Sequence, residues 1–101
     1  MINKVKEILA NAIRSHSLVL VLYHQQWRVV EPYLIGILGG HEHLHCFQIA
    51  GGSVSGGIPQ WRNLRLDDIK QLEIIPSSYF EIRDSYHPKN ANYMPIEEQI
   101  T

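Results

Sequence analysis

The stretch WRNLRLDDI, residues 61–69, places two arginines three positions apart between apolar side chains. A guanidinium group carries its N–H donors in a planar fork, which suits it to phosphate and carboxylate groups. Arg62 and Arg65 are therefore candidates for binding an anion, and Arg28 is a third. The alternative is that each arginine pairs with a nearby acid or lies on a solvated strand face. The acids available for such pairing include Glu31, Asp67 and Glu73.

Aromatic and small polar residues add candidates for ligand contacts. Tyr23 and Trp61 offer ring faces on which a base could stack, although such rings more often fill a small core. Residues 50–60, AGGSVSGGIPQ, form a glycine-rich loop whose backbone N–H groups could cradle a phosphate. This loop lacks the lysine of a P-loop and opens no helix, so a flexible hairpin connection is the alternative. If a ligand binds, Ser53 and Ser55 are the candidates to close over it.

Residues 41–45, HEHLH, raise the question of a metal site. His41, His43 and His45 alternate along a predicted strand and share one face, where two imidazoles could hold zinc or nickel. A closed structural site needs four ligands, and the sole cysteine, Cys46, falls on the opposite face. We therefore favour a solvated or stacked strand face, with His45 as a candidate hydrogen-bonding partner for a ligand. Neither a metal nor another cofactor is predicted.

Composition bounds the class of protein. The 101 residues hold nine Lys plus Arg and ten Asp plus Glu, so no global field draws the chain to nucleic acid or membrane. With 45% hydrophobic and 19% charged residues, one folded domain is expected, and no apolar run is long enough to span a bilayer. A single cysteine excludes an internal disulfide and suits the cytoplasm, where we expect the protein. Because no nucleophile-elbow motif or metal-dyad spacing occurs, we expect no enzyme activity.

The elements that must position these residues are a helix followed by short strands. Apolar residues recur at spacings of three and four over residues 2–13, which predicts an amphipathic helix. Strands are predicted at residues 17–24, 27–38, 41–49, 61–66 and 71–75. Pro32 interrupts the second strand, which should bend, bulge or lie at an edge there. The pattern predicts an α+β fold, mainly β, with an N-terminal helix and a small, closed or nearly closed antiparallel barrel.

Residues 1–80 are predicted to form this single domain. Residues 81–101 belong to a tail, rich in aromatic residues and prolines without a clear period, that begins near Ser77. We expect the tail to be extended and either to pack on the barrel or to be partly disordered, fraying near Thr101.

Three segments together resemble the WYL domain. They are AIRSHSLVLVLYHQQWRVVEPYLIG, GGHEHLHCFQIAG and WRNLRLDDIKQLEII, which lie within residues 8–80. The best match is Arg62 to Ile69, set against the family's closing R-x-F-R-L-D-R-I, and the second is Arg28 to Pro32, set against R-x-V-x-P. The chain departs from the family at the namesake Trp-Tyr-Leu, which reads Glu42-His43-Leu44, and at the final arginine, which is Asp68.

The resemblance implies a five-stranded Sm-like (Src-homology-3-like) small β-barrel of the kind found in bacterial transcription regulators and defence-linked proteins. It implies that the strands carrying Arg28, Arg62 and Arg65 come together, so that a groove lined by arginines would bind a nucleotide, another anionic small molecule or a nucleic-acid end. The expected function is non-enzymatic ligand sensing by a standalone WYL-like domain. The alternative is a protein-interaction or oligomerisation module without a small ligand, acting as a homodimer or with a separately encoded partner.

Overall fold

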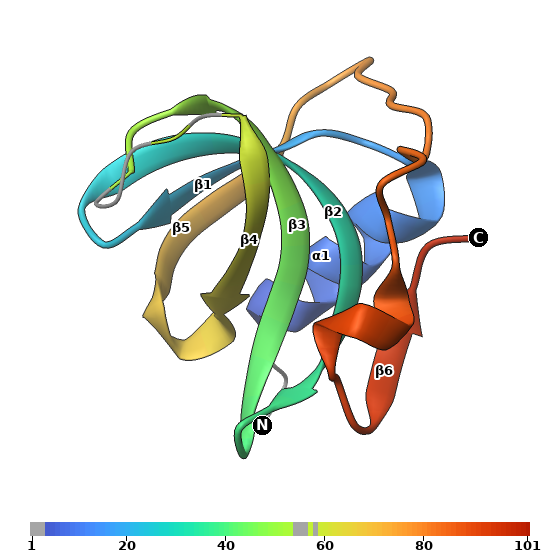
Figure 1. The fold of residues 1–101 in the computed structure, drawn as a ribbon. Coiled ribbons are helices and arrows are strands. Elements are labelled where there is room, and N and C mark those ends of the chain that lie inside the picture. The colour runs from blue at the N-terminus through green and yellow to red at the C-terminus, as the bar shows by residue number, and fades with distance from the viewer. Residues whose placement is uncertain (1–3, 54–56, 58) are drawn as a thin grey trace.

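Figure 1 shows the computed structural model of the chain, which describes residues 4–53, 57 and 59–101. One helix precedes a mostly antiparallel sheet, so the fold is mainly β, as the sequence predicts. The helix and strands are α1 (Lys4–Ser15), β1 (Val19–Tyr23), β2 (Gln26–Leu38), β3 (His41–Gly51), β4 (Gln60–Arg65), β5 (Ile69–Ile74) and β6 (Ile96–Gln99). Two short 3-10 helices, η1 (Leu66–Asp68) and η2 (Pro88–Ala91), join β4 to β5 and interrupt the C-terminal segment.

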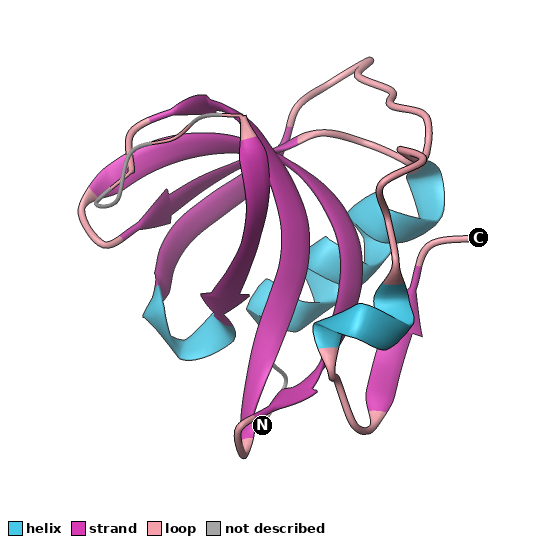
Figure 2. Cartoon of the chain, in the orientation of Figure 1, coloured by secondary structure: helices cyan, strands magenta, loops and turns pink. Residues whose placement is uncertain are grey.

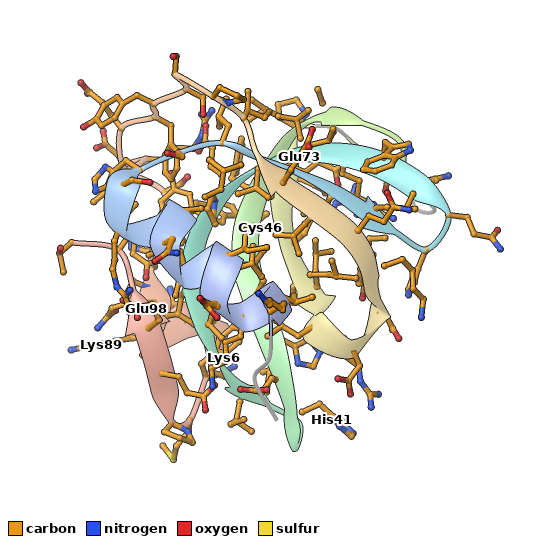
Figure 3. All side chains as sticks on the ribbon, turned by 180° about the vertical axis from the view of Figure 1, so that it is seen from behind. Lys6, His41, Cys46, Glu73, Lys89 and Glu98 are labelled. Carbon is orange, nitrogen blue, oxygen red and sulfur yellow. The ribbon has the colours of Figure 1, made fainter. Side chains whose placement is uncertain are left out.

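The helix α1 covers one side of the sheet with the apolar stripe that its sequence predicts. Leu9, Ala12 and Ile13 are fully buried, and α1 contacts β2, β5 and β6. Figure 3, seen from behind, shows α1 lying across the strands. Burying one Leu or Ile side chain contributes about 1.5–3 kcal/mol, so this stripe alone accounts for the docking of the helix. None of the helices in the described part of the chain is both long enough and apolar enough to span a membrane.

In the described part of the chain the sheet has six strands, one more than predicted. Its main order is β4-β3-β2-β1-β5, and β6 pairs with β2 off this path. The long strand β2 offers one edge to β3 over residues 28–38 and divides the other edge between β1 and β6 (Figure 2). The register shifts between Pro32 and Leu34, which confirms the irregularity predicted at the proline.

The predicted barrel is not closed by hydrogen bonds. β4 and β5 are the two ends of the strand order, and no ladder between described residues joins them. The two strands follow each other through η1, yet they leave a gap, which we call the seam. Burial is nonetheless continuous on the inner face, where Val19, Val21, Val30, Leu44, Cys46 and Leu64 are at most 2% exposed.

The C-terminal segment packs on the sheet through β6 and through apolar side chains. β6 pairs with residues 34–36 of β2, and the N–H of Ile100 donates to the carbonyl of Tyr33 at 2.8 Å. Phe80, Tyr93 and Ile100 are all under 8% exposed. The segment therefore packs on the sheet at Ile100, whose apolar side chain is buried in the core.

Candidate functional site

Strand β4 separates the predicted site residues into two groups. The inner face of β4 carries Arg62 and Leu64, whose ladder partners Cys46 and Leu44 are fully buried. Trp61 and Asn63 face the other way, opposite Phe47 and His45, because successive side chains of a strand point to opposite faces. Two hollows result, an inner one that contains arginines and an outer one that contains aromatic rings and amides.

The inner hollow brings together four of the residues singled out from the sequence. It has a volume of about 230 Å³ and lies among β1, β2, β4 and the segment after β3. Its lining residues are Tyr23, His24, Arg28, Ser53, Arg62, Asn63 and Leu64. Ser55 lies outside the described residues, so the predicted closure by the loop stays a prediction.

Glycine allows the end of β3 to approach β2 closely beside this hollow. Gly51 has φ +96° and pairs with Arg28, and a Cβ at Gly51 would collide with the carbonyl oxygen of Trp27. The next N–H, that of Gly52, donates to the same carbonyl at 3.0 Å. This close approach places Ser53 at the wall of the hollow.

Arg28 is the central residue of the inner hollow. It is only 3% exposed, and its two Nη atoms donate to Gln48 Oε1 at 3.4 Å and to the Tyr23 carbonyl at 3.3 Å. Its Nε is buried without a hydrogen-bond partner, and its Cζ lies 5.1 Å from the centre of the Tyr23 ring. Burial, and next the charge of Arg62, lower the pKa of Arg28. Among the described residues no carboxylate forms an ion pair with it.

Arg62 reaches the same hollow from β4. With the Gln60 amide turned so that its oxygen faces the guanidinium, that oxygen accepts from both Nη atoms of Arg62, at 2.7 and 2.8 Å. Arg28 and Arg62 line the same hollow, and the positive charge of Arg62 contributes to the lowered pKa of Arg28. Two like charges at a confined site create a local positive potential in a protein whose net charge is −1.

Arg65 does not join the other two arginines. It stands three residues from Arg62 and thus on the other face of β4, and it does not line the inner hollow. Its Nη2 lies 3.8 Å from Asp67 Oδ2, so for Arg65 the structure has the acid pairing that the sequence left open. The expected convergence of three arginines is therefore reduced to two, because the odd spacing divides them between faces.

Trp61 and His45 line the outer hollow, which has a volume of about 410 Å³. Their rings stack with centres 4.9 Å apart and an angle of 6° between planes. His45 Nδ1 lies 2.8 Å from Asn63 Oδ1, and the indole N–H of Trp61 donates to Ser85 Oγ at 3.1 Å. The lining residues are Leu38, His45, Trp61, Asn63, Ser85, His87, Asn90, Ala91 and Asn92.

The histidines of β3 do not form a metal cluster. His43 Nδ1 lies 2.8 Å from the carbonyl of His41, and His45 bonds Asn63. The described part of the chain contains no group of three or more His, Cys, Asp or Glu side chains arranged to hold a metal ion. For His45, stacking against Trp61 matches the stacked strand face that the sequence favoured.

The sequence missed a buried ion pair between β2 and the C-terminal segment. Glu31, 4% exposed, accepts from Arg83 Nε at 2.9 Å and Nη2 at 3.0 Å, and from the Tyr33 hydroxyl at 2.9 Å. Glu31 had been a candidate partner for the site arginines, and it is instead occupied by Arg83. The bond with Glu31 raises the pKa of Arg83, and burial raises that of Tyr33. No local pattern around Arg83 signals this contact, since the two residues lie 52 positions apart.

Comparison with known proteins gives a fold and no family. No family model and no curated protein matches the chain. A solved structure of proteasome accessory factor B/C (PafBC) of Arthrobacter aurescens superposes with a TM-score of 0.71 at 14% sequence identity. The match covers 88% of this chain and 14% of the PafBC chain, so this chain spans a small part of that protein's length. At this sequence identity the likeness shows the fold alone.

Proposed function

We propose that this protein is a non-enzymatic regulatory domain of the WYL-like kind, which senses a ligand by binding its anionic group in the inner hollow. Arg28 and Arg62 would donate to the anion, Tyr23 would pack beside it and Ser53 would add a hydroxyl. The likeness of the fold to part of PafBC supports the regulatory role, and the lined hollow supports the binding role.

The observation that carries the proposal is that the Arg28 guanidinium is buried and forms no ion pair with a carboxylate of the described residues. Removing a guanidinium from water costs several kcal/mol unless other groups replace its solvation. Here the described neighbours are two neutral oxygens and one ring face, Nε has no partner, and a second arginine lies nearby. An anion entering the hollow would add the missing negative charge, and this explains why the chain keeps a buried arginine at this position.

The size of the hollow limits what it can hold. A volume of about 230 Å³ is below the roughly 300–1,000 Å³ of sites that enclose a whole small molecule. A phosphate or pyrophosphate group fits this size, and the remainder of a nucleotide or nucleic-acid end would extend outside. In this proposal the sheet is an Sm-like barrel that is incomplete at the seam, and the ligand enters beside Tyr23 at that opening.

Calorimetric titration with inorganic pyrophosphate, ADP and a 5′-phosphorylated oligonucleotide tests the proposal. Arg28→Gln and Arg62→Gln are expected to weaken binding at least about tenfold, because a charge-assisted hydrogen bond contributes about 1.5–3 kcal/mol. Arg65→Gln is the matched control and is expected to bind like the wild type. The same oligonucleotide with a 5′-hydroxyl should bind weakly.

Thermal unfolding gives a second readout of the same binding. A ligand at a hundred times its Kd should raise the free energy of unfolding by about 2.7 kcal/mol for the wild type and for Arg65→Gln. If no phosphate-bearing probe binds, or if Arg65→Gln weakens binding as much as Arg28→Gln, the inner hollow is not an anion site.

The alternative function is a protein-interaction module. It is favoured by one observation, that β4 and β5 end the strand order of the sheet and can accept a further strand. A homodimer or complex that survives dilution, with no anion binding, would support this alternative. In either case we place the protein in the cytoplasm, because its one cysteine, Cys46, is buried and suits a reducing compartment.

A further inference from the structure

The outer hollow has a size and a set of lining residues that suit a second ligand-binding site. It lies on the opposite face of β4 from Arg62, between β3, β4 and the C-terminal segment around η2. Its volume of about 410 Å³ falls within the range of sites that enclose a small molecule. Among its described lining residues none is Asp, Glu, Lys or Arg, so an uncharged ligand suits it.

The hydrogen bonds around Asn63 fix which atoms remain available in this hollow. Asn63 Oδ1 accepts from the Tyr93 hydroxyl at 2.8 Å and lies 2.8 Å from His45 Nδ1. Because a carbonyl oxygen only accepts, Nδ1 must carry the proton, and Nε2 of the neutral ring is then an acceptor. Burial lowers the pKa of His45, which keeps the ring neutral near pH 7.

Two polar groups of this network have no partner among the described residues. They are Nε2 of His45, an acceptor, and the amide NH₂ of Asn63, a donor. Both residues border the hollow, and both are held in place, His45 by stacking on Trp61 and Asn63 by its two bonds. A rigid acceptor and a rigid donor beside aromatic rings favour a ring-shaped ligand that offers the complementary groups.

We propose that the outer hollow is a second binding site, which shares Asn63 with the lining of the inner hollow, for a small uncharged heterocycle that carries both an N–H donor and a carbonyl acceptor. The ligand's N–H would donate to His45 Nε2, and its carbonyl would accept from the Asn63 amide. Ser85, Asn90 and Asn92 supply further polar groups at the rim.

The two tryptophans of the chain allow a direct test with uracil as the probe. The indole N–H of Trp61 lies at the outer hollow, whereas Trp27 is the second residue of β2, is 45% exposed and does not line the hollow. In ¹H–¹⁵N NMR spectra, uracil is expected to shift the Trp61 indole signal saturably and to leave that of Trp27 in place. An affinity in about the millimolar range is expected for so small a ligand.

A matched ligand and two variants separate the proposed contacts. 1,3-Dimethyluracil keeps the ring and both carbonyls but has no N–H, so it should bind about tenfold more weakly. Asn63→Asp keeps the oxygen that His45 and Tyr93 use and loses the NH₂ donor, and His45→Phe keeps a ring against Trp61 and loses the acceptor. Each should weaken uracil binding by a similar factor.

Arg28→Gln distinguishes this site from the anion site. It should bind uracil like the wild type even where it fails to bind pyrophosphate. The two proposals can therefore be contradicted independently of each other. Equal shifts of both indole signals, no saturable shift, or equal binding of uracil and dimethyluracil would overturn the proposal.

Discussion

The hydroxyl of Tyr23 accepts a hydrogen bond from the backbone N–H of Arg65 at 3.1 Å, and so joins β1, which pairs with β5, to β4 across the seam. The same tyrosine lines the inner hollow and places its ring 5.1 Å from the Arg28 guanidinium. Tyr23 therefore links β4 to the β1–β5 side of the sheet, and it also forms part of the wall of the inner hollow. The sheet needs such a contact because no ladder between described residues closes it.

Tyr23→Phe is expected to lower the free energy of unfolding by about 1 kcal/mol, the contribution of one hydrogen bond. The ring beside Arg28 remains, so only the bond across the seam is lost. Amide hydrogen exchange should become faster at Arg65 while β2 and β3 stay protected. Tyr79→Phe is the control, since Tyr79 is 66% exposed, and it should change neither quantity. Unchanged exchange at Arg65 would contradict a role for this bond.

Arg83→Met is expected to destabilise the fold by about 2 kcal/mol, because it leaves the Glu31 carboxylate buried without its cation. The value is set below that of a fully buried pair because the Arg83 side chain is 41% exposed. Urea denaturation measures it, and Arg65→Met, which removes an exposed pair at 3.8 Å, should cost under about 0.5 kcal/mol.

A double-mutant cycle with Glu31→Gln isolates the interaction between Glu31 and Arg83. The two substitutions together should cost less than the sum of their separate effects, since the second removes a charge that the first left unpaired. Strict additivity would mean that the ion pair contributes nothing to stability.

Gly36→Ala is expected to loosen β6 from β2. A Cβ at Gly36 would lie 2.7 Å from the carbonyl oxygen of Pro95 and 3.2 Å from Cα of Ile96, so the backbone must move. The expected cost is about 2 kcal/mol, within the range for overpacking. Hydrogen exchange should accelerate at residues 96–100 and remain slow in β1 and β3.

Gly39→Ala provides the comparison for Gly36. At Gly39 an added Cβ meets nothing within 4 Å, and the residue has φ +60°, so any cost is confined to local backbone strain. This variant should leave the exchange of β6 unchanged. If both variants loosen β6 equally, the close approach at Gly36 is not what determines its docking.

The pH dependence of stability should contain a contribution from His45. Burial lowers its pKa in the folded protein, while the unfolded chain keeps a value near 6.5. Below about pH 6.5 the unfolded state therefore binds more protons, and the free energy of unfolding falls as the pH falls toward the folded pKa. Urea denaturation at about pH 7.5 and about pH 5.5 measures this loss. His45→Phe should reduce it, and since the other histidines remain in both proteins, an identical loss would contradict the prediction.

Local patterns in the sequence determined the helix, five of the strands and most of the candidate binding residues. Spacings of three and four predicted α1, alternation and turn residues predicted β1 to β5, and Pro32 predicted the irregularity in β2. These features depend on neighbours in the chain, so a single sequence contains them. Arg28 and Arg62 were chosen for their chemistry and their match to a motif, and the fold brings both to one hollow.

Only the tertiary structure decided which candidate residues share a hollow and which distant residues pair with them. It placed Arg62 and Arg65 on opposite faces of β4, assigned Glu31 to Arg83, and added β6 to the free edge of β2. Each outcome depends on a partner distant in the chain, and burial and pairing at such distances follow from how the strands pack. The alternation that divides the arginines is visible in the sequence, but which face becomes the interior is set by the strands and helix that cover it.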